Sequence, residues 1–215
     1  MYFKAGTHKE NGLRYSPFKA LIAPRPIGWI STKDKQGKAN LAPYSFFNAI
    51  SELPPMVMFS SAPKMSKTEG LAASDYHKDS LANIQETGEF AVNISGLSQI
   101  DAMIASGVGH PADIDEFETA GLGKIAATDI DVPLVEGAPA HLECKLHDCI
   151  SLPGTPDREG CVMVIGHVIS IHIDERYISD GKVDTAAFAP LGRLGYKDYC
   201  AVETLFEKEG VLAPR

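Results

Sequence analysis

The stretch RPIGWIST, residues 25–32, is followed by a polar segment that ends in Gly37 and by the returning run ANLAPYSFFNAI, residues 39–50. The aromatic and β-branched residues of the first run are typical of a strand, and the polar segment is typical of a hairpin turn. Pro43 has no N–H to donate to a neighbouring strand. We therefore expect the returning strand to lie at a sheet edge, or to be bulged or interrupted at Pro43.

Further runs of the chain are also typical of strands, because they alternate or are short and apolar. They comprise residues 56–60, 89–94, 141–147 and 161–171. Turn-forming residues lie between the last two runs, which predicts that these two strands pair as a hairpin. Asp180-Gly181 indicates another turn.

Helical patterns lie mainly between the two groups of strands. One helix is expected to begin with Asp79 or Ser80 as its cap and to end at Gly88, and Ser98 is expected to cap another that continues through Ala105. Residues 108–139 are expected to be loops with one short helix near 114–119, and the tail from 199 to 209 is expected to be helical.

This order of elements predicts a mainly β protein with helical insertions, built as a barrel. It lacks the regular strand–helix alternation of a parallel α/β sheet. No linker, repeat or low-complexity segment divides the sequence, so residues 1–215 are predicted to form a single domain.

Charge and composition narrow the classes of partner. The chain carries 20 basic and 28 acidic residues, a net charge of −8, and has no basic run with interleaved aromatics. Nucleic acid would be repelled, so nucleic-acid binding is not expected. No apolar run reaches the roughly 18 residues that span a bilayer, and no secretory signal is visible. We therefore expect a cytoplasmic protein, without a membrane partner, whose four cysteines are reduced.

Three familiar site patterns are not supported. The glycine patterns at 107–112 and 121–126 lack the preceding strand that a dinucleotide-binding fold requires. The positions of Cys144 and Cys149 differ by five, an odd number, which puts the two side chains on opposite faces of a strand, so no metal site is predicted. His141, Glu143, Lys145 and His147 share one face, interpreted as a solvated strand surface. No catalytic acid, base or nucleophile is assigned.

A dispersed set of polar side chains is more informative. Hydroxyls, amides and a lysine are the groups that bind a phosphate and a polyhydroxyl chain, and aromatic side chains can form the walls around a flat ring. The polar members are Ser31, Thr32, Asn40, Ser45, Asn48, Ser60, Ser61, Lys78, Asp79, Ser80 and Asn83, and the aromatic ones are Trp29, Tyr44, Phe46 and Phe47. On composition alone, these residues are equally well explained as caps, turn residues and ordinary core aromatics.

Several of these segments together resemble a known family. The runs 25–32, 40–48 and 78–84, followed by 88–93, 181–184 and 190–196, are similar to the flavin reductase-like, FMN-binding split-barrel proteins. The resemblance extends from about residue 24 to 196, in the expected order. It implies a six-stranded Greek-key split barrel that forms a homodimer, with FMN bound near the subunit interface.

The resemblance also implies which residues bind FMN. The run 40–47 matches the stretch beside the flavin ring and ribityl chain, and Ser31 and Thr32 match the adjoining strand. Trp29 is expected to form part of the apolar wall beside the ring. The end of the third strand matches residues 60–61, the phosphate side matches 78–80, and a C-terminal segment that can cover the ring matches 193–196. The cofactor-binding residues expected in this way are Trp29, Ser31, Thr32, Asn40, Ala42, Pro43, Tyr44, Ser45, Phe46, Phe47, Ser60, Ser61, Lys78, Asp79, Ser80, Arg193 and Tyr196.

In such proteins the flavin carries out the redox chemistry, so no catalytic side chain is needed. The expected function is NAD(P)H-dependent reduction of flavin, with free flavin or a redox protein as acceptor. One alternative is a flavoredoxin-type electron carrier that NAD(P)H does not reduce directly. A second is a barrel that has lost its flavin and serves as an interaction module.

Overall fold

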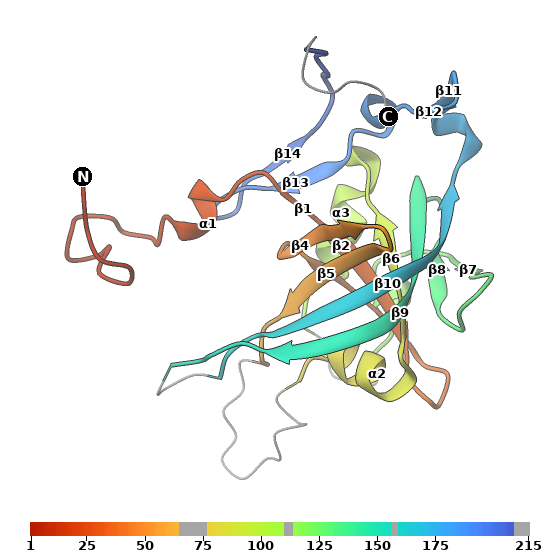
Figure 1. Cartoon of the computed structure of the whole chain (residues 1–215), viewed down its shortest axis with the longest axis horizontal. Helices are drawn as coiled ribbons and strands as arrows, with labels where there is room; N and C mark the ends of the chain where they lie inside the picture. The colour runs from red at the N-terminus through yellow and green to blue at the C-terminus, as the bar shows by residue number, and fades with distance from the viewer. Residues whose placement is uncertain (65–76, 110–113, 156–158, 209–215) are drawn as a thin grey trace.

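A sheet of seven antiparallel strands is the centre of the structure, a computed structural model that describes residues 1–64, 77–109, 114–155 and 159–208 (Figure 1). The strand order is β3-β2-β6-β9-β10-β5-β4. Their bounds are β2 Gly28–Lys33, β3 Ala39–Tyr44, β4 Phe47–Glu52, β5 Pro55–Ser61, β6 Glu89–Ile94, β9 Ala140–Ser151 and β10 Val162–Ile173.

Smaller elements surround this sheet. The short strands are β1 Arg25–Pro26, β13 Leu191–Arg193 and β14 Tyr199–Ala201 in one sheet, the hairpin of β7 Lys124–Ala126 and β8 Pro133–Val135, and the hairpin of β11 Ile178–Ser179 and β12 Lys182–Val183. The helices are α1 Phe18–Leu21, α2 Asp79–Thr87, α3 Ile100–Ala105, α4 Glu116–Thr119 and α5 Thr185–Phe188, with 3₁₀ turns at Leu97–Gln99 and Glu175–Tyr177. No helix in the described ranges is long and apolar enough to cross a membrane.

The two edge strands of the main sheet are consecutive in the chain. β3 and β4 lie at opposite ends of the strand order, yet only Ser45 and Phe46 separate them. The sheet must therefore curl until its edges approach each other. The Ser60 amide of β5 donates a 2.8 Å hydrogen bond to the Phe46 carbonyl, which extends the β4–β5 pairing into this link. β3 and β4 are not paired neighbours, so the barrel is split here. The edge position predicted for the strand containing Pro43 is confirmed.

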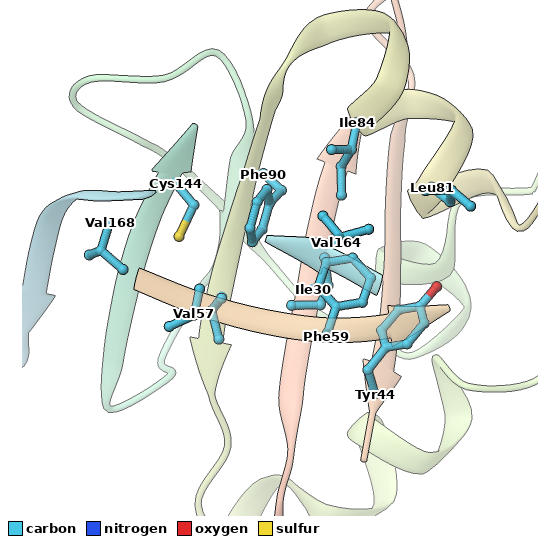
Figure 2. Close-up of a cluster of buried hydrophobic side chains, with 11 residues drawn as sticks. Ile30, Tyr44, Val57, Phe59, Leu81, Ile84, Phe90, Cys144, Val164 and Val168 are labelled. Carbon is cyan, nitrogen blue, oxygen red and sulfur yellow. The ribbon is translucent and has the colours of Figure 1, made fainter. Parts of the chain in front are cut away.

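The barrel interior is filled by a cluster that α2 covers. Figure 2 shows Leu81 and Ile84 of this helix against the strand residues, with the Tyr44 hydroxyl directed toward the end of α2 that carries Leu81. Phe59 and Phe90 are fully buried in the same cluster. Burying each such ring contributes about 1.5–3 kcal/mol relative to exposure.

A second cluster covers the outer face of β2. Because side chains alternate along a strand, Ile30 points into the barrel while Trp29 points outward. Trp29 packs in a cluster with Met103 of α3 and Phe117 of α4, and its indole N–H donates a 2.8 Å hydrogen bond to Ser106. The helical insertions thus form an outer layer on one side of the barrel.

The predicted helix caps are partly wrong. Lys78 is the N-cap of α2, and neither Asp79 nor Ser80 supplies a side-chain cap. Ser80 instead accepts a 2.8 Å hydrogen bond from Asn40, so a tertiary contact occupies its hydroxyl. Ser98 lies in a 3₁₀ turn before α3 and does not cap that helix. Gly88 closes α2 in the left-handed conformation at φ 76°, as predicted.

The predictions for the loop region 108–139 and for the C-terminal tail also differ from the structure. The short helix predicted near 114–119 is present as α4, but residues 108–139 also include the β7–β8 hairpin, whose six residues are too few to show a period in the sequence. The tail predicted to be helical forms β14, which pairs with β13, and has no regular structure from Val202 to Lys208. Residue 209 lies outside the described residues. The main sheet has seven strands where the family resemblance implies six.

The strand face interpreted as solvated is in fact buried at two positions. Glu143 is fully buried and His141 is 5% exposed, because the loop 127–131 covers this part of β9. The amides of Thr128 and Asp129 donate to the Glu143 carboxylate at 2.8 and 2.7 Å. Burial alone would raise the pKa of Glu143, but these amides and the imidazole of His172 hold it below its usual value.

His141 joins this carboxylate region to the outer layer. Asn93 Oδ1 accepts from the Val135 amide and from His141 Nδ1, at 2.9 and 2.8 Å. Burial, and secondarily the charge of His172, lowers the pKa of His141 from 6.5 to about 4, with the charge of Glu143 acting in the opposite direction. The folded state therefore favours the neutral imidazole.

This network predicts a pH-dependent loss of stability. The contribution of neutral His141 is fully present above pH 6.5 and is lost as the pH falls toward about 4, because the unfolded chain binds the proton first. The loss is up to about 3 kcal/mol. His141→Asn keeps an N–H that can donate to Asn93, so its free energy of unfolding should fall less steeply over this range. Urea unfolding at several pH values measures the difference.

The matched control is His167→Asn, because His167 is exposed on β10. This variant should keep the pH profile of the wild-type protein. Equal slopes for His141→Asn and the wild type would contradict the assignment.

Candidate functional site

The junction between β3 and β4 borders a cavity of about 210 Å³. Ser45 and Pro43 line it, and the exposed ring of Phe46 lies nearby, with Lys19 Nζ at 5.9 Å and Arg25 Cζ at 6.0 Å from its centroid. The full lining is Lys19, Arg25, Ile27, Pro43, Ser45, Met103, Arg193, Leu194, Tyr196 and Tyr199. The structure thus brings Pro43, Ser45, Arg193 and Tyr196 together, four of the residues expected to bind cofactor.

Arg25 holds one wall of this cavity. Its guanidinium donates to the carbonyls of Lys19, Ile22 and Leu194, which ties α1 to the β13–β14 segment. Arg25 is 6% exposed, and its Nε is buried without a hydrogen-bond partner among the described residues. Burial lowers the pKa of Arg25, and the charge of Arg193 lowers it further. Two cations therefore face the same space.

Arg193 and Tyr196 form the opposite wall. Arg193 Nη2 donates a 2.6 Å hydrogen bond to the Tyr196 carbonyl, and its guanidinium lies 4.2 Å from the centroid of the Tyr199 ring. Tyr196 adopts φ 58°, a left-handed conformation that is uncommon for a residue with a side chain. This backbone conformation places its half-exposed ring 5.7 Å from that of Tyr15.

A second polar group lies at the start of α2. Asn40 Nδ2 donates to Ser80 Oγ at 2.8 Å, and Lys78 Nζ lies 5.5 Å from the centroid of the Tyr44 ring. Lys78 is exposed, whereas Asn40 and Ser80 are buried. The structure therefore gathers hydroxyl, amide and ammonium groups from two distant parts of the chain.

Two hydroxyls in this group are unsatisfied. Tyr44 Oη and Ser61 Oγ are buried and have no hydrogen-bond partner in the part of the chain that the structure describes. Burial raises the pKa of Tyr44, and the nearby hydroxyls of Ser80 and Ser61 oppose that shift without reaching hydrogen-bond geometry with it. A buried unpaired hydroxyl costs about 1–3 kcal/mol, so each is a position where a ligand atom would be stabilising.

Two acidic residues complete the surroundings of α2. Asp79 accepts a 2.8 Å hydrogen bond from Lys64 Nζ, and buried Glu116 accepts the Leu41 amide of edge strand β3 at 3.2 Å. Burial raises the pKa of Glu116, and the charge of Asp79 adds to that rise. Sequence reasoning missed Lys19, Arg25, Lys64 and Glu116 as site residues. Lys64 lies three residues after Ser61, the second of the two serines expected to bind cofactor. This proximity was the only feature of the sequence that pointed to Lys64 as a site residue.

Three residues expected to bind cofactor have internal partners instead. Trp29 is fully buried, Ser31 accepts from Asn93 at 3.1 Å, and Thr32 accepts from Asn83 at 3.0 Å. Their side chains are enclosed by protein, so direct cofactor contacts from them stay a prediction. Ala42 and Phe47 are half-buried against the barrel core, and Ser60 is half-buried on β5.

The side chains that could ligate a metal are not grouped in the structure described. In the described ranges, no three side chains of His, Cys, Asp or Glu lie together as metal ligands. Cys144 is buried in the barrel core, which raises the pKa of its thiol above the usual range.

Comparison with known proteins now defines the family. The model of the flavin reductase-like domain matches residues 21–190. The chain belongs to the flavin reductase-like domain family. A split-barrel flavin reductase domain from Shewanella frigidimarina has the same fold, with 21% identity, a TM-score of 0.77, and coverage of 98% of this chain and 100% of that one. The predicted family and split-barrel fold are confirmed.

Two solved structures are more similar in sequence. Nitrilotriacetate monooxygenase component B from Bacillus cereus is 31% identical, with a TM-score of 0.84, over 97% of this chain and 98% of that one. The 2-nitrobenzoate 2-nitroreductase NbaA from Pseudomonas fluorescens is 28% identical, with a TM-score of 0.78, over 100% of this chain and 99% of that one. This is a family of FMN-binding proteins that includes oxidoreductases.

The residues at the start of α2 fit the chemistry of FMN. A phosphate needs a cation and hydrogen-bond donors, and Lys78 and Ser80 offer these groups. A ribityl chain needs hydroxyl partners, and Tyr44 and Ser61 carry the two that are unsatisfied. The fit rests on these orphaned hydroxyls, independently of the sequence match.

Tyr44→Phe tests this fit. Removing a buried, unpartnered hydroxyl should leave the free energy of unfolding without FMN unchanged or raise it by about 1 kcal/mol. The same change should weaken FMN binding about three- to tenfold, because a ligand contact is lost. Chemical denaturation and an FMN titration measure the two effects.

The control is Tyr177→Phe, whose ring packs on Phe188 of α5. FMN affinity should not change in this variant. A destabilised Tyr44→Phe protein with normal FMN affinity would show that the hydroxyl serves the fold instead.

Proposed function

We propose that the protein is an FMN-dependent oxidoreductase that uses NAD(P)H to reduce flavin. The observation that carries the proposal is the family match across residues 21–190. It is supported by the hydroxyl and ammonium groups of Tyr44, Ser61 and Lys78, which suit a phosphorylated, polyhydroxylated cofactor. The likeness to two proteins named as a monooxygenase component and a nitroreductase favours redox chemistry.

In this proposal the side chains bind and orient, and the redox chemistry comes from the bound flavin. Lys78 and Ser80 would bind the phosphate, and Tyr44 and Ser61 would bind the ribityl chain. The stretch from Pro43 to Phe47 would lie along the ring system, at the split of the barrel. Free flavin or a redox protein would accept the electrons, and we keep the cytoplasmic location expected from the sequence.

The first test is the absorption spectrum and the pyridine-nucleotide oxidation rate of the purified protein. We expect it to bind FMN and, with FMN present, to accelerate oxidation of NADH or NADPH. Lys78→Ala should weaken FMN binding about tenfold or more, because a charge-assisted contact is lost. FMN binding without oxidation of either nucleotide would instead favour a flavoredoxin-type electron carrier.

The control for Lys78→Ala is Lys182→Ala, which removes an exposed lysine from the β11–β12 hairpin. Its FMN affinity should equal that of the wild type. A protein that takes up no FMN at all would contradict the proposed function.

We also propose that two copies of the chain form a homodimer. Exposed apolar side chains gather around β4, with Leu53 89% and Ile50 48% exposed. Burying such residues against a second copy would be favourable. Sedimentation analysis should give twice the 23.1 kDa mass of one chain, and a monomer at micromolar concentration would contradict this expectation.

A further inference from the structure

The cavity at the β3–β4 junction carries an excess of positive charge that no ion pair among the described residues neutralises. Lys19, Arg25 and Arg193 line it, and none of its lining residues is acidic. None of these three cations forms an ion pair with any described residue. This contrasts with the net charge of −8 of the whole chain.

The arrangement is costly without an anion. The charge of Arg193 lowers the pKa of Arg25, because the two positively charged guanidinium groups repel each other. Only 6% of the Arg25 surface is exposed, so solvent screens this repulsion weakly. Its Nε donor also has no hydrogen-bond partner within the described ranges. A negative charge in the cavity would offset both the repulsion and the loss of solvent.

The remaining walls are apolar or aromatic. Ile27, Met103, Pro43 and Leu194 supply aliphatic surface, and the rings of Tyr196 and Tyr199 face the same space. A cavity of about 150 Å³ is enough for one benzene ring. The 210 Å³ available here therefore suits a single ring with one small charged substituent, and is small beside the 300–1,000 Å³ typical of pockets for larger ligands.

We propose that this cavity binds a small planar aromatic carboxylate. Guanidinium groups pair with carboxylates through two parallel hydrogen bonds, and Arg193 has donors beyond the one that binds the Tyr196 carbonyl. The ring of the ligand would lie against the tyrosines and Met103. Because Ser45 and Pro43 belong both to this cavity and to the stretch expected beside the flavin, such an acid would bind next to the cofactor of the proposed oxidoreductase. This last step rests on the proposed function.

Calorimetric titration of benzoate into the purified full-length protein tests the proposal. Benzamide is the matched probe, because it has nearly the same shape without the charge. We expect benzoate to bind at least about tenfold more tightly than benzamide. Equal binding of the two probes, or no benzoate binding, would overturn the proposal.

Variants locate the binding. Arg193→Gln and Lys19→Gln should each weaken benzoate binding, the first about tenfold or more. Lys19 is exposed and makes no side-chain hydrogen bond in the described residues, so its variant keeps the test valid if Arg193→Gln fails to fold. Lys197→Gln removes an exposed charge outside the lining and should bind as the wild type does. An equal loss in all three variants would show a general charge effect and overturn the site.

Two further measurements separate this inference from others. Inorganic phosphate at the same concentration should not displace benzoate; displacement would overturn the carboxylate assignment in favour of a phosphate site. An FMN titration runs in parallel. FMN uptake without benzoate binding would remove this inference and leave the proposed function intact, whereas benzoate binding without FMN uptake would support the cavity and remove the flavin function.

Discussion

The two-residue link between β3 and β4 is the constraint on which the rest of the structure depends. Ser45 and Phe46 must carry the chain from one edge of a seven-stranded sheet to the other. The three Cα–Cα steps from Tyr44 to Phe47 span at most about 11 Å, so the sheet has to curl. The curl creates the interior that α2 covers, and it leaves a split at which polar side chains and the cationic cavity come together.

Local sequence was sufficient for the elements that depend on local rules. Pro43 marked an edge strand because it lacks a donor, and Gly88 marked a helix end because it adopts a left-handed conformation. The family resemblance then placed Lys78 and Tyr44 in one site, and in the structure Lys78 Nζ lies 5.5 Å from the centroid of the Tyr44 ring. Each of these predictions used information within a few residues, or a motif shared with relatives.

The features of the fold and site that the sequence did not predict depend on contacts between residues far apart in the chain. His141 and Glu143 alternate along the sequence with the apolar Leu142 and Cys144, as surface residues of a strand do, and only the loop 127–131, folded back over β9, makes them buried. Arg25 begins the first strand-like run of the sequence, but its role comes from hydrogen bonds to three carbonyls, one of them that of Leu194. Such partners lie up to 169 residues apart, and no local pattern records them.

The chain has one tryptophan, and its position gives the protein a built-in optical reporter. Trp29 is fully enclosed in the outer cluster, with its indole N–H on Ser106 just after α3. Indole emission depends on polarity, so it reports whether the helical insertions remain docked on β2. Circular dichroism of the strands reports the barrel itself. Where the two signals change at different denaturant concentrations, the outer layer opens as a separate unit.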